Sequence, residues 1–208
     1  MTTERPSALV RATLTLEKTT ALDRVADAVQ PLADKLVADP RVRRVLHGRD
    51  MGHALHPVLT DVPIGAWLSA ATLDLLGGEV SRPAAQRLVG LGVLSAVPTA
   101  LAGWSEWAET DGPERRVGVV HATANVLGLT VYAGSWFARR AGWHRTGVLL
   151  GMKGLAVVGL GGFLGAHLSL ARKVSTRHEA FDVDSGEPEG TADRTLDDVG
   201  ELGAGGTA

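Results

Sequence analysis

The chain has 208 residues, a length typical of one domain with room for a sizeable hydrophobic core. Its 21 basic and 23 acidic residues give a formal net charge of -2, so no net positive field attracts nucleic acid. Because cysteine is absent, disulfides, thiolate zinc sites and an iron-sulfur cluster held by this chain are excluded, and any metal must bind to histidine or to carboxylates.

Residues 1–46 predict a cytoplasmic amphipathic helical segment. They lack the charged stretch, apolar stretch and cleavage site that together mark a secretory signal. Apolar residues instead recur at helical spacing, at Leu22, Val25, Val29, Leu32 and Leu36. Pro31 should bend or split this helix. Because the polar face carries acids as well as bases, we expect the segment to pack on the protein rather than on the membrane surface.

Residues 47–175 predict a transmembrane domain. Four apolar spans lie near residues 57–76, 88–107, 117–137 and 147–171. The third has no charged residue over about the length that crosses the hydrocarbon core, whereas a buried helix of a soluble bundle, the alternative, normally shows a charged face. Glycine- and proline-containing turns give short connections, so neighbouring spans should be antiparallel. The predicted fold is therefore all-α, an integral membrane up-and-down bundle of four helices.

The flanking charges predict an orientation in the membrane. Lys and Arg are more frequent on the side that holds both termini, which predicts cytoplasmic termini. Residues 176–208 are rich in acids and glycine and predict a disordered tail. Asp74 and Lys153 fall near span ends on the outer side, where we expect both to reach water.

Several polar residues are predicted to meet at the cytoplasmic end of the bundle. They are His53, His56, Asp61, His121, Asn125 and His167. Asn125 lies one turn after His121 on the same helix face. Polar groups inside a bilayer are unfavourable by several kcal/mol unless they are paired, so such a group is a candidate site.

Three interpretations of this cluster remain open. Imidazoles on facing helices are suitable axial ligands for haem b, with His121 paired to His167 or His56, His53 as a further candidate and Asn125 beside them. A non-haem metal ion could instead be held by His56, His121, His167 and Asp61. In the third interpretation these side chains only hydrogen-bond across the bundle and fix its packing.

No catalytic residue is predicted. Glycine-rich phosphate loops, nucleophile elbows and metalloprotease motifs are absent from the sequence. A small transporter would require polar groups at mid-membrane in both halves and an internal repeat, and the sequence shows neither convincingly.

Residues 47–65, HGRDMGHALHPVLTDVPIG, resemble a bacterial family of small four-helix membrane proteins of unknown function, often fused to a Rieske-type iron-sulfur domain. The resemblance continues at Gly103-Trp104, at His121 with Asn125, and at residues 161–168. Its helices and histidines also resemble those of b-type cytochromes. The resemblance implies a place in the inner membrane of a bacterial cell. It also implies electron transfer between a quinone or soluble donor and a Rieske-type partner, with His121 and His167 as axial ligands and His56 as a substitute. The alternative is a structural or assembly module without a cofactor.

Overall fold

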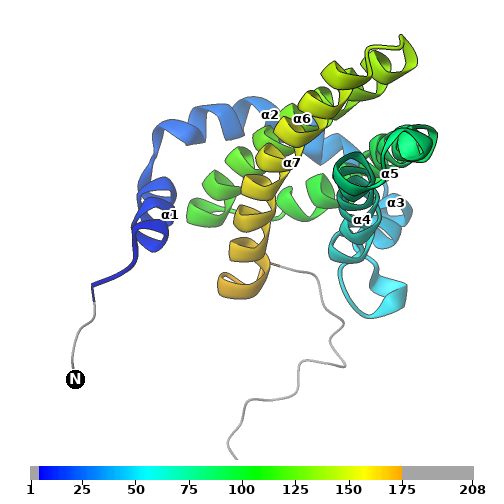
Figure 1. The fold of residues 1–208 in the computed structure, drawn as a ribbon. Coiled ribbons are helices and arrows are strands. Elements are labelled where there is room, and N and C mark those ends of the chain that lie inside the picture. The colour runs from blue at the N-terminus through cyan, green and yellow to red at the C-terminus, as the bar shows by residue number, and fades with distance from the viewer. Residues whose placement is uncertain (1–4, 175–208) are drawn as a thin grey trace, which may run out of the picture. The chain divides into compact units, whose positions relative to one another are not determined.

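Helices form every regular element in residues 5–174, the part of the chain that the structure, a computed structural model, describes (Figure 1). The predicted acidic tail at 176–208 lies outside these residues. The helices are α1 (Ala8–Lys18), α2 (Ala21–Val37), α3 (Pro40–Leu46), α4 (Leu55–Leu76), α5 (Arg82–Trp107), α6 (Gly112–Arg140) and α7 (His144–Ala166). A π-helical turn, His167–Ala171, extends α7. The all-α prediction is confirmed for the described residues.

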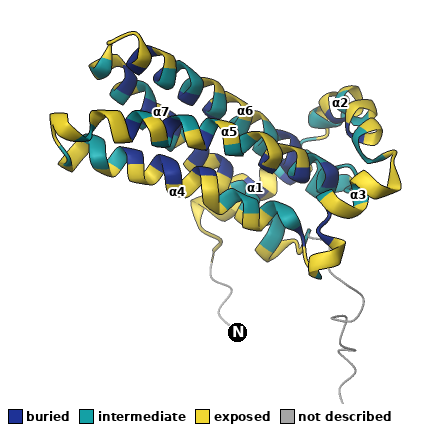
Figure 2. Cartoon of the chain, turned by 90° about the vertical axis from the view of Figure 1, so that its right-hand side faces the viewer, coloured by how far each residue is buried: buried dark blue, intermediate teal, exposed yellow. Residues whose placement is uncertain are grey.

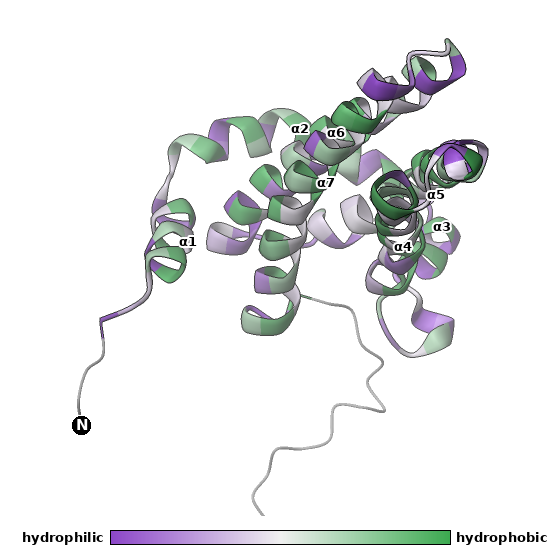
Figure 3. Cartoon of the chain, in the orientation of Figure 1, coloured by the Kyte–Doolittle hydropathy of each residue, from purple (hydrophilic) through white to green (hydrophobic). Residues whose placement is uncertain are grey.

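Long helices occupy all four predicted spans. Three stretches are long and apolar enough to cross a membrane by length and composition: Glu79–Trp107, Gly112–Arg140 and His144–Ala171. Helix α4, which carries Asp61 and Asp74, is not among them, so its crossing stays a prediction. Hydrophobic residues cover much of α4 to α7, while hydrophilic residues gather at the turn between α6 and α7 (Figure 3).

The N-terminal segment, residues 1–46, forms three helices over its described part, α1, α2 and α3, in place of the single predicted one. The first break falls at Thr19 and Thr20, whereas α2 continues through Pro31. Helix α2 contacts α5 and α6, and two salt bridges fix it there: Asp27 to Arg115 at 2.8 Å and Asp23 to Arg116 at 2.7 Å. The charged face of α2 therefore binds the protein, as its mixed acids and bases predicted.

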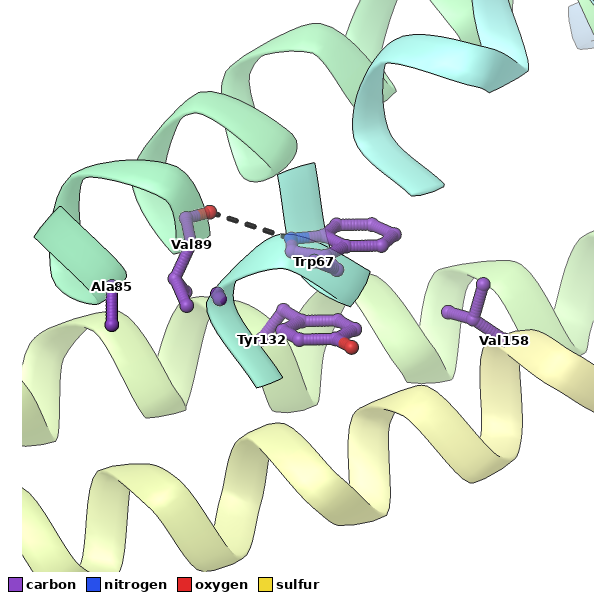
Figure 4. Packing of buried hydrophobic residues seen from close by; sticks show 6 residues of the cluster. Trp67, Ala85, Val89, Tyr132 and Val158 are labelled. Carbon is purple, nitrogen blue, oxygen red and sulfur yellow. Dashed lines mark hydrogen bonds between the residues drawn. The ribbon is translucent and has the colours of Figure 1, made fainter. Parts of the chain in front are cut away.

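The core lies between two helical hairpins, α4 with α5 and α6 with α7. The rings of Trp67 on α4 and Tyr132 on α6 stack with centroids 4.0 Å apart and planes 5° apart. Trp67 donates its indole N–H to the carbonyl of Val89 on α5 at 3.4 Å, and Val158 of α7 completes the cluster (Figure 4). Buried positions lie along the length of α4 to α7, among exposed ones, because these helices pack on one another (Figure 2).

The second hairpin repeats the arrangement of the first. The stacked pair Trp67–Tyr132 joins residues 65 positions apart, and the same offset of 65 relates the ion pair Asp74–Arg139. It also relates His56 to His121, whose rings contact each other. Contacts between equivalent positions are typical of a two-fold arrangement, in which each residue near the axis meets its own counterpart.

Glycines repeat in the same way on the second helix of each hairpin. A Cβ on Gly92 of α5 would lie 2.2 Å from the Trp67 indole, and one on Gly154 of α7 would lie 2.9 Å from the Tyr132 ring. The internal repeat that the sequence did not reveal is therefore present in the structure. The repeat leaves little trace in the sequence, since tryptophan stands opposite tyrosine and aspartate opposite arginine, although histidine stands at both positions of one pair.

Candidate functional site

Two of the predicted histidines face each other between the hairpins. His56 lies in the first turn of α4 and His121 in the third turn of α6, with ring centroids 6.2 Å apart and planes 85° apart. The other four candidates are distributed differently, and only Asn125 joins this pair. The structure therefore brings together His56, His121 and Asn125.

Each imidazole is held by a backbone carbonyl of the next helix. His56 Nδ1 lies 2.9 Å from the Thr99 oxygen on α5, and His121 Nδ1 lies 2.8 Å from the Gly161 oxygen on α7. A carbonyl oxygen only accepts hydrogen bonds, so Nδ1 carries the proton in both rings. In the neutral form each Nε2 then keeps a lone pair that can accept a hydrogen bond or bind a metal.

Close helix contact at two glycines makes these positions possible. A Cβ on Gly103 would lie 2.8 Å from His56 Cε1, and a Cβ on Gly165 would lie 2.8 Å from His121 Cε1. Real Cβ atoms do not approach other atoms so closely, so any larger residue would move the ring. Glycine at these two places therefore sets the positions of both imidazoles.

Asn125 acts on His121 directly. Its Nδ2 donates to His121 Nε2 at 3.0 Å, one turn back along α6. A Cβ on Gly161 would lie 2.6 Å from Asn125 Oδ1, so this glycine leaves room for the amide. The predicted proximity of Asn125 to His121 is thus accompanied by a hydrogen bond to the nitrogen that would bind a metal.

The remaining candidates lie apart from the pair. His53 is exposed before α4, with its Nδ1 3.1 Å from the Ala54 oxygen, and Asp61 is exposed on α4. His167 contacts Glu17 of α1, Nε2 to Oε1 2.8 Å. Within residues 5–174 no hydrogen bond, ion pair or ring contact joins these three to His56 or His121. The described residues also contain no group of three or more His, Asp and Glu side chains that could hold a metal ion.

The contact between Glu17 and α7 was not predicted. Glu17 is 4% exposed and also accepts from Arg172, whose Nε lies 2.8 Å from Oε1. The hydrogen bond from Arg172, followed by that from His167, holds the pKa of the Glu17 carboxyl below its ordinary value. The sequence did contain a signal for this contact, because Glu17 lies among the apolar residues on one face of α1. If that face is buried, the acid requires a partner.

A buried ion pair occupies the other end of the bundle. Arg139 donates Nη1 to Asp74 Oδ1 at 2.8 Å and Nη2 to Oδ2 at 2.5 Å, with side chains 1% and 2% exposed. Ser135 accepts from Arg139 Nε at 3.3 Å and donates to the Gly147 carbonyl at 2.6 Å. The expectation that Asp74 reaches water is wrong, because Arg139 provides a partner across the hairpins, whereas Lys153 is exposed.

Three layers therefore connect α4 to α6: the imidazole pair, the aromatic stack and the ion pair. The middle layer contains one unusual group, because the Tyr132 hydroxyl is buried and has no hydrogen-bond partner among the described residues. This stack fills the space between the two polar ends.

Comparison with known proteins identifies the chain at the level of its family. Residues 52–178 match a family described as "Predicted membrane protein (DUF2231)", a stretch that includes α4 to α7, all three apolar spans and both paired histidines. No curated protein and no solved structure matches the chain significantly. The predicted membership in a membrane family of unknown function is confirmed, while the association with Rieske-type domains stays a prediction. The chain therefore belongs to the DUF2231 family of predicted membrane proteins.

Proposed function

We propose that the protein is a membrane electron carrier that binds haem b between α4 and α6, where His56 and His121 would hold the haem iron. The observation that supports this most directly is the separation of the two rings, 6.2 Å between centroids. Two imidazoles that bind one metal through bonds of about 2 Å place their ring centres about 6 Å apart. His56, rather than His167, is the proposed partner of His121, because His167 is engaged with Glu17.

The set of donors favours haem over a bare metal ion. A structural or catalytic zinc site uses three or four protein ligands, and residues 5–174 contain no such group. A haem iron already has its equatorial nitrogens and needs one or two protein ligands. Both rings also donate Nδ1–H to a carbonyl, which is the usual way in which a protein fixes the tautomer and orientation of a ligating histidine.

The surrounding residues would control the two ligands. The Thr99 and Gly161 carbonyls accept from Nδ1 and so leave each Nε2 of the neutral rings with a lone pair, and Asn125 donates to that of His121. Haem b, when bound, supplies reversible one-electron transfer. Asn125 would therefore compete with haem iron for Nε2 of His121.

The repeat supports a fourth membrane crossing by α4. His56 to Asp74 covers about 27 Å along an α-helix, close to the hydrocarbon thickness of about 30 Å. At three levels along this length α4 meets the equivalent residue of α6, which is itself apolar enough to cross. We propose that α4 and α6 cross side by side, with the termini in the cytoplasm and a Rieske-type protein as electron partner.

Absorption spectra test the haem proposal. Full-length protein is purified in mild detergent from cells supplied with iron and haem precursor, and spectra are recorded after oxidation and after dithionite reduction. We expect a sharp reduced-minus-oxidised band that disappears in His56→Ala and in His121→Ala. The band should persist in His53→Ala, the matched control, because His53 is exposed and outside the pair. Wild-type protein without this band and without iron contradicts the proposal.

A structural module without a cofactor is the second candidate. It is favoured by one observation: His121 already has hydrogen-bond partners at both ring nitrogens, the Gly161 carbonyl and Asn125. In this case His121→Ala lowers stability by about 0.6 kcal/mol, the average for a hydrogen bond between membrane helices. Thermal unfolding of the same variants, together with their spectra, separates the two functions.

A further inference from the structure

A groove of about 420 Å³ lies beneath α2, between this helix and the pair α5 and α6. It is lined by Val25 and Val29 of α2, Trp104 and Trp107 of α5, and side chains of α6 that include Ala122 and Val126. The groove is separate from the imidazole pair, so it carries an inference that does not depend on haem.

Three of the four side chains along the groove that carry a polar group are paired within the protein. Thr123 and Thr130 donate their hydroxyls to the carbonyls of Val119 and Val126, each at 2.8 Å, on their own helix. Trp107 donates its indole N–H to the Arg115 carbonyl at 3.0 Å. Apart from the Trp104 indole N–H, which has no hydrogen bond among the described residues, the lining offers hydrocarbon surface to a ligand.

Polar contacts keep α2 in place above the groove. Gln30 donates to the carbonyl of Ala108 at 3.1 Å, and the guanidinium of Arg115 binds Asp27 at 2.8 Å. Arg116 binds both carboxylate oxygens of Asp23, at 2.7 and 2.9 Å. These polar contacts attach α2 to α5 and α6. Val25 and Val29 therefore lie over the groove, and the groove stays open because α2 is not held by packing of these two side chains.

The groove opens toward exposed apolar residues of α6. Its α6 wall includes Val126 and Leu127, which are 57% and 53% exposed. Helices α5 and α6 both belong to the apolar stretches that can cross a membrane. Water forms no hydrogen bonds with apolar walls, whereas a hydrocarbon chain forms favourable dispersion contacts with them. Lipid tails are the hydrocarbon next to this opening.

We propose that the groove beneath α2 binds one acyl chain of a bilayer phospholipid, and that this lipid stays with the protein during purification. This lipid differs from those on the outer surface of the helices because α2 covers its acyl chain. The headgroup remains at the membrane surface, at the level of Trp104 and Trp107, because tryptophan is typical of that interface.

The number of lipid molecules that stay bound after purification tests the proposal directly. Full-length protein is purified in mild detergent, and bound lipid is counted by native mass spectrometry and by extraction. We expect about one phospholipid per protein, with a several-fold loss in Ala122→Trp, which fills the groove. Leu94→Trp is the matched control, since Leu94 is 74% exposed on α5 outside the groove, and should retain the lipid.

A photoreactive probe provides a test without mutation. Wild-type protein in vesicles that contain a phospholipid with a diazirine on its acyl chain is irradiated, and the labelled peptides are mapped. We expect label on α2 around Val25 and Val29 as well as on α6. Labelling of exposed α5 and α7 surfaces without α2, equal lipid retention in both tryptophan variants, or an isoprenoid in place of phospholipid overturns the proposal.

Discussion

Asp74 of α4 and Arg139 of α6 form a two-bonded ion pair that is almost completely buried, although each residue lies near the end of its helix. The pair joins equivalent positions of two repeated hairpins. Its two hydrogen bonds match the planar guanidinium to the carboxylate and give the contact a fixed geometry. The contact therefore fixes the register between the hairpins at the end opposite to the histidines.

Removal of one partner should destabilise the protein strongly. Arg139→Met leaves the Asp74 carboxylate buried without its counterion, and we expect a loss of about 3–5 kcal/mol. Thermal unfolding in detergent measures the change. The adjacent Arg140→Met is the control because Arg140 is exposed. The double variant Asp74→Leu with Arg139→Met should recover much of the loss, and a double variant as unstable as the single one would contradict this account.

The glycines behind the histidines should be sensitive to one methyl group. Gly165→Ala places a Cβ 2.8 Å from His121 Cε1 and should displace the ring, with a loss of about 1–3 kcal/mol from overpacking. Gly162→Ala is the matched control on the same helix, since nothing lies within 4 Å of its Cβ. We expect that control to be neutral or slightly stabilising because alanine favours helix. Under the haem proposal, only Gly165→Ala also weakens the reduced-minus-oxidised band.

The hydroxyl of Tyr132 should be dispensable for stability. It is buried without a partner among the described residues, and an unpaired buried hydroxyl is unfavourable by about 1–3 kcal/mol. Tyr132→Phe keeps the stack on Trp67 and should leave the melting temperature unchanged or raise it. Tyr132→Ala should lower stability by about 3–5 kcal/mol through lost packing. Clear destabilisation by Tyr132→Phe would reveal a partner for the hydroxyl.

Attachment of α1 to α7 should depend on the charge of Glu17. Its pKa is held below the ordinary value of 4.5, so its stabilisation is fully present above pH 4.5 and is lost as the pH falls through the lowered pKa. Glu17→Gln should accelerate amide hydrogen exchange in α1 at pH 7, where wild-type α1 is protected. In thermal unfolding, acidification below pH 4.5 should destabilise wild type more than Glu17→Gln.

A surface acid provides the control for this prediction. Asp34 is exposed on α2, and Asp34→Asn should leave exchange in α1 unchanged. Equal protection of α1 in wild type and Glu17→Gln would show that the apolar face of α1, rather than Glu17, holds the helix in place.

Local sequence properties predicted the helices correctly, but they also predicted wrongly that a proline would interrupt one of them. Apolar length and turn residues depend only on neighbours in the chain, and helices occur at all four predicted spans. Pro31 did not interrupt α2. Polar contacts with Arg115 of α6 hold α2 at Asp27 and Gln30, in the turn before the proline, and outweigh the propensity of that one residue.

The sequence by itself determined the helical class, the apolar spans, the family and the set of polar residues from which the site is drawn. Only the tertiary structure decided that His121 meets His56, that His167 meets Glu17, and that Asp74 is buried on Arg139. The reason is geometric. Successive residues point about 100° apart around a helix, so the side chain that a residue meets depends on how each helix is rotated and packed. That rotation and packing depend on glycines and side chains far apart in the chain.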